Sequence, residues 1–417
     1  MRSSSALATV SFGATKNRRS ALVLASLAVI TTTITMLSMI APGPALARQR
    51  RSNPAAAAKP AQPDKLPAAY AAALLMEPET GTVMFESNEH KPWPTASLAK
   101  MMIAMIVAEK LADGSLKLSD KVVASHKAAE MGGSQVYLKE GETVSLDDMM
   151  KAIMVHSAND VSVAVAEYLG GSTEAFVQMM NREAARLGMQ DTHYYSVHGL
   201  PPARGQQADM SSARDEALLA RALTGYPQVM QWASIDTTPF RGGAFELRNT
   251  NHLVRTYKGC DGLKTGFYAL AGFNVAATAR RQGLRLIAVV MGSPRKQENF
   301  SSATTLLSQG FMNYYLYPVG KKGAPIGQDV AVGGGASSYF KPVWGSDLNV
   351  FMKHGEEKSA IKVAFDMPPK LQAPIKAGQG VGKGVVTIAG QPGGSAPLVA
   401  PADIPQGGII SRLIGRL

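Results

Sequence analysis

A serine and a lysine three residues apart, Ser97 and Lys100, stand at the start of a segment whose composition favours a helix. Residues 97–112 are rich in Ala, Leu and Met and are mostly apolar. Residues three apart on a helix lie on the same face, so the lysine can reach the serine hydroxyl. Because serine is a poor nucleophile at neutral pH without a base, this pair predicts a nucleophile beside its general base.

A lysine acts as a base only if its pKa is depressed. Burial on an apolar helix disfavours the charged form, and a second cation, Lys264, would lower the pKa of Lys100 further. The Ser-x-x-Lys pattern alone is weak, because Ser293-Pro-Arg-Lys296 repeats it. We interpret that second copy as a helix N-cap serine followed by proline at the first helical position.

A second polar string, Ser157-Ala-Asn159, interrupts a long apolar run. Two polar side chains therefore lie where a helix pair would otherwise bury only hydrocarbon, and buried polar groups are costly unless they are paired. This pattern favours a site. A helix-to-helix turn capped by the serine and the asparagine is the alternative interpretation.

The third string is Lys264-Thr265-Gly266. The two segments that follow it, 271–280 and 284–292, are typical of adjacent strands joined by a short glycine turn. We therefore expect the string on a neighbouring strand, where the glycine lets another backbone approach closely.

The three strings in this order resemble those of serine-type D-alanyl-D-alanine carboxypeptidases, the low-molecular-weight penicillin-binding proteins. The resemblance extends to residues 71–81, to Leu187–His193 with Ser196–Leu200, and to Asp261–Gly266. It covers about residues 67–417.

The resemblance implies that Ser97 is the acylated nucleophile, that Lys100 is its base and that Ser157 relays a proton to the leaving amine. Lys264 would hold the Ser157 hydroxyl and supply positive charge. The backbone N–H groups of Ser97 and Phe267 would form the oxyanion hole.

The remaining implied roles concern substrate binding. Asn159 would bind the substrate peptide and Thr265 its terminal carboxylate, and Gly266 completes the motif strand. The implied substrates are peptidoglycan stem peptides, with β-lactam antibiotics as inhibitors.

The sequence departs from the family pattern in three places. Phe267-Tyr268 stands where many relatives have His-Thr or Phe-Thr, and Val197 replaces a proline. Arg295 is displaced from the position where some relatives carry a carboxylate-binding arginine. The stretch after Leu187 also lacks the glutamate and asparagine pair of class A β-lactamases, which predicts slow hydrolysis of penicillin.

The expected fold is a mixed α/β, β-lactamase/transpeptidase-like domain at 67–318, an antiparallel sheet flanked by helices. From about residue 319 the sequence becomes rich in Gly, Pro and Val, with short strand-like segments separated by turn residues. This pattern predicts a small all-β domain at 319–406. At 417 residues and 46% hydrophobic composition, the chain can bury cores of this size.

Both ends of the chain predict segments outside these domains. Residues 1–47 have a basic region, an apolar run at 21–40 and a small-residue cleavage site, which together indicate a signal peptide. An uncleaved membrane anchor is the alternative. Residues 48–66 are expected to be a disordered linker.

Residues 407–417 place five aliphatic side chains on one helical face, which predicts an amphipathic helix that attaches to the inner-membrane surface. A helix docked on its own β domain is the alternative. We expect an exported periplasmic protein, peripherally attached to the cytoplasmic membrane.

The charge and the remaining residues narrow the partners. Removal of residues 1–47 takes away four basic residues and lowers the net charge from +12 to +8, which suits anionic lipid or an acidic wall polymer. The sequence has no basic cluster with interleaved aromatic residues, so it does not predict nucleic-acid binding. Cys260 is the one cysteine, and His193 and His198 lack a third ligand, so we expect no disulfide, metal or cofactor.

The predicted reaction is removal of the terminal D-alanine from stem pentapeptides. Two alternatives stay open: an endopeptidase that cleaves D-Ala cross-links, and a peptidoglycan-binding scaffold whose catalysis has decayed.

Overall fold

The structure is a computed structural model that describes residues 9–10 and 70–408. The predicted signal peptide (apart from Thr9 and Val10), the predicted linker and residues 409–417 of the predicted terminal helix lie outside the described residues. In the described part of the chain, no helix has both the length and the apolar character needed to cross a membrane.

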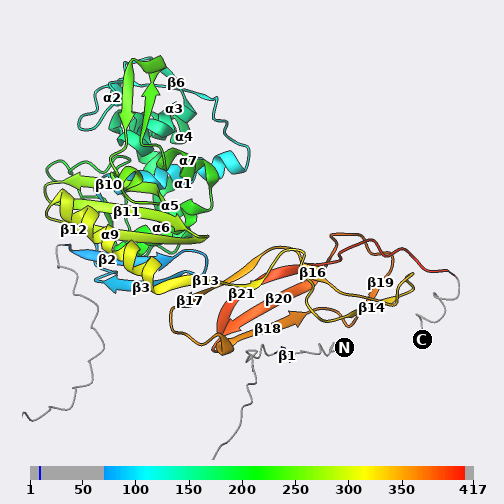
Figure 1. Ribbon diagram of the computed structural model, residues 1–417. Coiled ribbons are helices and arrows are strands. Elements are labelled where there is room, and N and C mark those ends of the chain that lie inside the picture. Colours follow the sequence, from blue (N-terminus) through cyan, green and yellow to red (C-terminus); the bar gives the residue numbers. More distant parts are fainter. Residues whose placement is uncertain (1–8, 11–69, 409–417) are drawn as a thin grey trace, which may run out of the picture. The chain divides into compact units, whose positions relative to one another are not determined.

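A five-stranded antiparallel sheet with the order β10-β11-β12-β2-β3 forms the centre of the first domain (Figure 1). Its strands are β2 (Ala72–Glu77), β3 (Thr82–Ser87), β10 (Cys260–Tyr268), β11 (Gly272–Arg281) and β12 (Leu284–Ser293). The predicted strand pair is therefore confirmed as β11 and β12. Because β2 pairs with β12, with Ala73 opposite Val290, the sheet joins the beginning of the domain to its end.

Alternate side chains of this sheet enter two separate cores, as the period of two along a strand requires. Leu74 and Val289 are fully buried in the core shared with the helical cluster. Their chain neighbours Leu75 and Val290 enter the second core, where Leu306 of α9 packs. The strands are apolar almost throughout because both faces of the sheet are covered.

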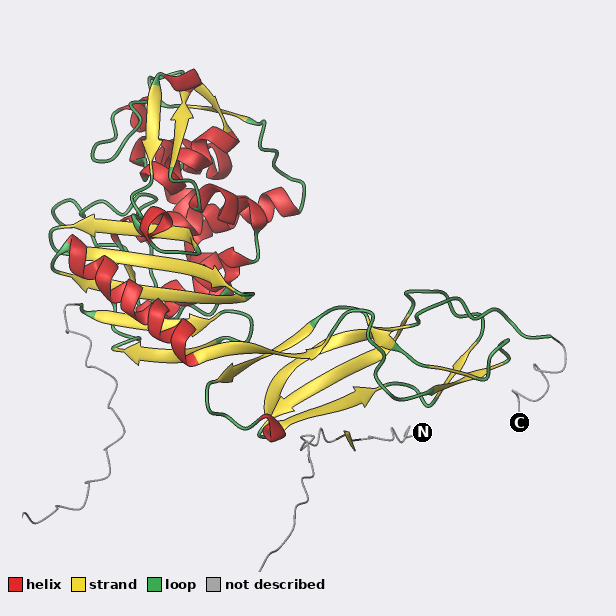
Figure 2. Ribbon diagram, in the orientation of Figure 1, coloured by secondary structure: helices red, strands yellow, loops and turns green. Residues whose placement is uncertain are grey.

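Helix α9 (Lys296–Asn313) covers one face of the sheet, and a helical cluster packs on the other through α6 and α7 (Figure 2). The helices that precede α9 are α1 (Lys100–Ala112), α2 (His126–Ala129), α3 (Leu146–Lys151), α4 (Asn159–Gly170), α5 (Thr173–Arg186), α6 (Ala213–Thr224), α7 (Pro227–Ala233) and α8 (Leu253–Thr256). The predicted arrangement of an antiparallel sheet flanked by helices is confirmed.

Two helix boundaries differ from the sequence prediction. Ser97 lies in a short 3-10 helix, η1 (Ala96–Ala99), and α1 begins only at Lys100. The prediction that Ser293 is a helix N-cap is wrong. Ser293 is the buried last residue of β12, and the N-cap residue of α9 is Arg295. The antiparallel ladder with β11 extends to Ser293 and leaves no room for an earlier helix start.

Three short strand pairs complete this domain. They are β4 (Trp93–Pro94) with β7 (Met210–Ser211), β5 (Lys121–Val123) with β6 (Thr143–Ser145), and β8 (Thr237–Phe240) with β9 (Phe245–Arg248). A 3-10 turn, η3 (Arg241–Gly243), joins β8 to β9.

The remainder of the described chain is β-rich, as predicted. One sheet has the order β1-β18-β20-β21-β16, a second β15-β14-β19, and β13 pairs with β17. Their bounds are β1 (Thr9–Val10), β13 (Tyr314–Gly320), β14 (Val330–Gly333), β15 (Tyr339–Phe340), β16 (Val343–Trp344), β17 (Leu348–Lys353), β18 (Ile361–Asp366), β19 (Lys370–Gln372), β20 (Gly380–Ile388) and β21 (Gln391–Val399), with the 3-10 turn η4 (Lys358–Ala360) before β18. Trp344, Val350, Val386 and Leu398 lie in its own apolar core.

Candidate active site

Ser97 and Lys100 are in direct contact. Lys100 Nζ donates a 2.8 Å hydrogen bond to Ser97 Oγ and a 2.5 Å hydrogen bond to the backbone oxygen of His198. Lys100 is fully buried, whereas Ser97 is only half-buried. The hydroxyl is therefore accessible while the amine beside it is shielded from water.

Burial lowers the pKa of Lys100 well below its ordinary value, and the charge of Lys264 lowers it further. Asp209 and Asp160 act in the opposite direction. Burial also lowers the pKa of Lys264, to about 7. Burial and the second cation thus both favour the neutral form of Lys100, which can accept a proton.

Ser157 lies where the helix after α3 changes direction. The π-helix η2 (Ala152–His156) ends at Ser157, which adopts a left-handed conformation with φ 66° and ψ 31°. The next helix, α4, begins at Asn159, whose Nδ2 donates to the backbone oxygen of Gly132 at 2.8 Å. Asn159 Oδ1 is buried and has no partner among the described residues, so it remains available to accept a hydrogen bond from a ligand.

Lys264, Thr265 and Gly266 lie in the middle of β10, the edge strand of the sheet. Lys264 Nζ donates to the backbone oxygen of Thr265 at 3.0 Å. A Cβ on Gly266 would lie 2.9 Å from the backbone nitrogen of Ser97 and 2.7 Å from the oxygen of Thr95. Only glycine lets the strand approach the serine turn this closely.

These three segments line one cavity of about 250 Å³. Its lining includes Ser97, Ser157, Thr265, Gly266 and Phe267. The Ser97–Lys100 pair is joined by a direct hydrogen bond, whereas Lys264 Nζ bonds a backbone oxygen. Of the predicted contacts among both lysines and both serines, the structure therefore has the Lys100–Ser97 bond, and the contact of Lys264 with the Ser157 hydroxyl stays a prediction.

Several lining residues were missed by the sequence analysis. They are Ser134, Thr250, Phe273, Asn274, Lys296, Asn299 and Phe300. Thr250 accepts a 2.7 Å hydrogen bond from Thr265 Oγ1, and the fully buried Asn274 donates from Nδ2 to the oxygens of Pro94 and Thr95. Lys296 ends the second Ser-x-x-Lys string, which we had interpreted as a helix start, and the others belong to no recognisable motif. The position of Asn274 two residues after Gly272, at the start of a predicted strand, was the available signal.

The three departures from the family pattern have different consequences. Phe267 is 56% exposed and stacks on Phe273 with a ring separation of 4.1 Å, so it forms an aromatic wall of the cavity. Arg295 is exposed and pairs with Glu298, while its neighbour Lys296 lines the cavity. Val197 is buried in the helical core, which an apolar residue satisfies as well as proline would.

Cys260 and His198 have ordinary structural roles. Burial raises the pKa of the Cys260 thiol to about 11, which leaves it inert. Burial, together with the charge of Lys100, lowers the pKa of His198 to about 4, so its imidazole is neutral.

The fold and the cavity, with a serine beside a buried lysine at the edge of an antiparallel sheet, define a transpeptidase-like serine hydrolase. A family model described as D-alanyl-D-alanine carboxypeptidase, peptidase S11, matches residues 57–295. A second, described as penicillin-binding protein 5, C-terminal domain, matches residues 314–406. The chain belongs to the peptidase S11 family of D-alanyl-D-alanine carboxypeptidases.

Individual relatives agree with this assignment. The chain is 33% identical over 344 residues to D-alanyl-D-alanine carboxypeptidase DacF of Bacillus subtilis, covering 82% of this chain and 87% of that protein. Among solved structures it is similar to penicillin-binding protein 5 of Haemophilus influenzae, with a TM-score of 0.62 and 28% identity over 81% of this chain and 98% of that one. Penicillin-binding protein D2 of Listeria monocytogenes, solved with ampicillin bound, gives a TM-score of 0.54 at 30% identity, covering 58% of this chain and 98% of that one.

The protein is thus a serine-type D-alanyl-D-alanine carboxypeptidase of the penicillin-binding class, and it processes peptidoglycan.

Proposed function

We propose that Ser97 is the nucleophile of this carboxypeptidase and that neutral Lys100 is the base that activates it. The observation that carries the proposal is the 2.8 Å hydrogen bond from a fully buried lysine to an accessible serine hydroxyl. Lys100 takes the proton of Ser97 as Oγ attacks the carbonyl carbon of the penultimate D-alanine. The bond to the terminal D-alanine breaks, and an ester on Ser97 remains until water hydrolyses it.

The other cavity residues take supporting roles in this proposal. Ser157 passes the proton to the leaving amine, and Lys264 supplies positive charge beside that hydroxyl. The backbone N–H groups of Ser97 and Phe267 stabilise the developing oxyanion. Such donors are most effective in a site that excludes water, and the two lysines of this site are fully buried.

The substrate itself is held by residues on both sides of Ser97. Asn159 Oδ1, which is buried and has no protein partner in the described part of the chain, accepts a hydrogen bond from the substrate amide. Thr265 binds the terminal carboxylate, and Gly266 lets the extended peptide lie against β10. β-Lactams enter the same cavity and acylate the same serine, as the ampicillin complex of the Listeria relative suggests.

Digestion of isolated muropeptides separates this activity from the endopeptidase alternative. We expect loss of the terminal D-alanine from pentapeptides and intact cross-bridges. Cleaved cross-bridges with intact pentapeptides would overturn the carboxypeptidase assignment of the site. A binding protein without catalysis would leave both unchanged.

The proposal extends to the place where the enzyme works. The mature chain begins after residue 47, a linker at 48–66 leads to the catalytic domain at 67–318, and the β domain at 319–406 precedes an amphipathic helix at 407–417. The helix attaches the exported enzyme to the periplasmic side of the cytoplasmic membrane through its aliphatic face.

Deletion of residues 407–417 tests this attachment. We expect the shortened enzyme in the soluble periplasmic fraction, with unchanged hydrolysis of a short soluble substrate. If the shortened enzyme remains with the membrane, the anchor lies elsewhere, and the apolar run at 21–40 becomes the next segment to test.

A further inference from the structure

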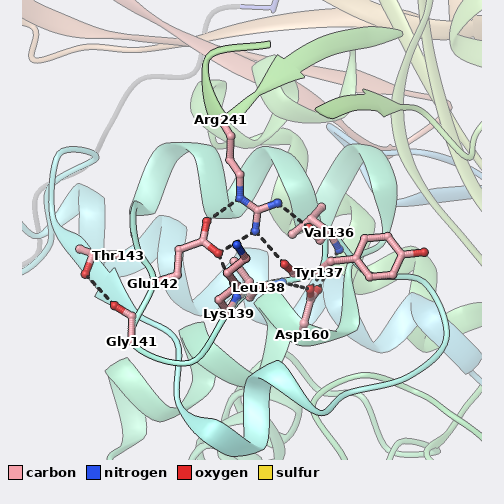
Figure 3. A network of polar contacts seen from close by, with 9 residues as sticks. All are labelled: Val136, Tyr137, Leu138, Lys139, Gly141, Glu142, Thr143, Asp160 and Arg241. Atoms are coloured by element: carbon pink, nitrogen blue, oxygen red, sulfur yellow. Dashed lines mark hydrogen bonds and ion pairs between the residues drawn. The ribbon is translucent and has the colours of Figure 1, made fainter. Parts of the chain in front are cut away.

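An arginine outside the cavity holds the loop that precedes β6 and packs beside the second catalytic motif. Arg241, in the turn η3 of the β8–β9 hairpin, forms a two-point ion pair with Glu142, at 2.5 Å from Nε and 2.8 Å from Nη2 (Figure 3). The same guanidinium donates to the backbone oxygens of Val136 at 2.6 Å and Tyr137 at 3.1 Å. One side chain therefore binds both ends of the loop 136–142.

The opposite edge of this loop is bound by Asp160, one residue after Asn159. The fully buried Asp160 carboxylate accepts from the backbone N–H groups of Val136 at 3.0 Å and Leu138 at 3.1 Å. Val136 thus gives its N–H to Asp160 and its oxygen to Arg241 (Figure 3). The loop is fixed between the hairpin and the start of α4.

The residues just before this loop contact the backbone on both sides of Ser157. Ser134 Oγ donates to the oxygen of His156 at 2.7 Å, and the Ser134 oxygen accepts from the backbone N–H of Asn159 at 2.7 Å. Asn159 Nδ2 is held by Gly132. A displacement of the loop would therefore move the backbone that orients Ser157 and Asn159.

Three residues in this connection have a left-handed backbone that non-glycine residues rarely adopt: Tyr137 at φ 59°, Ser157 at φ 66° and Arg241 at φ 53°. Such conformations are costly and persist only where the surrounding contacts impose them. The hairpin is also packed on the motif, since Phe245 lies edge-on to His156 with ring centroids 5.4 Å apart.

We propose that Arg241 is a positioning residue for the acylation of Ser97, acting on Ser157 and Asn159 through the loop 136–142 and the residues 132–134 before it. The proposal rests on the proposed function, because it requires Ser157 and Asn159 to take part in the reaction. Burial alone would raise the pKa of Glu142, but the hydrogen bonds from Arg241 and from the Lys139 N–H hold it below the usual value. The lowered pKa favours the ionised carboxylate that the pair with Arg241 requires.

The test compares Arg241→Gln, Arg241→Lys and the wild type in their reaction with labelled penicillin. Two quantities are measured: the rate constant of acylation and the final number of adducts per molecule. We expect Arg241→Gln to lower the rate constant tenfold to a hundredfold, since small displacements of positioned groups cost about this much. The final stoichiometry should remain one adduct per chain.

Arg241→Lys should retain an intermediate rate, because lysine keeps the charge but cannot bind the carboxylate and two carbonyls as a planar fork. Arg248→Gln is the matched control. Arg248 lies on the same hairpin, is exposed and pairs at 3.4 Å with the exposed Glu246, so its loss should leave the rate unchanged.

A purely structural role for Arg241 would give a different result. Partial unfolding lowers the final number of adducts while the folded fraction reacts at the wild-type rate, and that outcome overturns the inference. A wild-type rate with full stoichiometry in Arg241→Gln also overturns it. If the wild type itself forms no adduct at Ser97, the proposed function fails instead.

Discussion

Gly199 lies directly against the backbone oxygen of Ala96, the residue before the serine. A Cβ on Gly199 would stand 1.9 Å from that oxygen and 3.0 Å from the backbone nitrogen of Ser97. Gly199 also has φ 73°, and Ala96 itself has φ 48°. The turn that presents Ser97 is therefore packed backbone against backbone on the loop that supplies the His198 oxygen to Lys100.

Gly199→Ala is expected to shift this turn, because the clash involves backbone atoms that cannot rotate away. We expect a loss of unfolding free energy of about 2 kcal/mol or more and a slower acylation by penicillin. Gly114→Ala is the control. Gly114 has φ 79° but has no neighbour within 4 Å of an added Cβ, so only backbone strain should appear and acylation should be normal. Equal effects of the two variants in urea denaturation would contradict this account.

The pH dependence of acylation should report the two buried lysines. The charge of Lys264 lowers the pKa of Lys100, so Lys264→Gln should raise that pKa and move the acid limb of the acylation rate to higher pH. The measurement is the rate constant of penicillin acylation between about pH 5 and 9, where the limb belongs to the coupled pair. The exposed Lys258 provides the control, since Lys258→Gln should leave the profile in place. If the acid limb of the Lys264→Gln profile is unchanged or lies at lower pH, Lys264 does not lower the pKa of Lys100.

The free energy of unfolding should also depend on the titration of Lys264, and it should rise with pH. Because burial lowers the pKa of Lys264 to about 7, the unfolded chain binds more protons than the folded chain from about pH 7 up to the ordinary lysine pKa. The contribution of Lys264 to the free energy of unfolding should therefore increase as the pH rises through this window. Urea denaturation between pH 7 and 9.5 measures this effect. The free energy of unfolding should rise more steeply with pH in the wild type than in Lys264→Gln. Parallel curves would show that Lys264 is charged in the folded protein.

The penicillin adduct on Ser97 should be hydrolysed slowly. No carboxylate lines the cavity among the described residues, so no acidic side chain stands ready to activate a deacylating water. Asp191 and Thr192, which occupy the stretch where a β-lactamase would supply such groups, bond instead to Asp215 through the Asp191 N–H and Thr192 Oγ1. We expect near-stoichiometric consumption of penicillin over the time in which it acylates the enzyme. Hydrolysis of penicillin is measured by the absorbance of the β-lactam ring. Many turnovers per minute would contradict this interpretation of the cavity.

The neighbouring strands β10, β11 and β12 could be predicted because the third motif and the two strand segments after it are local patterns. β11 and β12 alternate between two cores, and their glycine turn marks the reversal. The start of α1 could not be predicted, because the apolar composition continues through Ser97, while the 3-10 geometry there depends on contacts with Gly199 and Gly266. These glycines are 102 and 169 positions away in the chain.

The cavity was only partly predictable for the same reason. Asn299 and Lys296 reach it from the first turns of α9, whose start was misjudged from the proline at 294. Arg241 is an unremarkable arginine before two glycines, and its role arises from a fold that brings the β8–β9 hairpin to the loop at 136–142. Long-range placement of this kind leaves no periodic signal in the sequence.

The most direct test of the account is mass spectrometry of the protein after incubation with penicillin. The account predicts one acyl adduct per molecule, mapped to the peptide that contains Ser97, and none in Ser97→Ala. Ser293→Ala, which removes the serine of the other Ser-x-x-Lys string, should be labelled like the wild type. An adduct that persists in Ser97→Ala, or a wild type that remains unmodified, would contradict the assignment of Ser97 as the nucleophile.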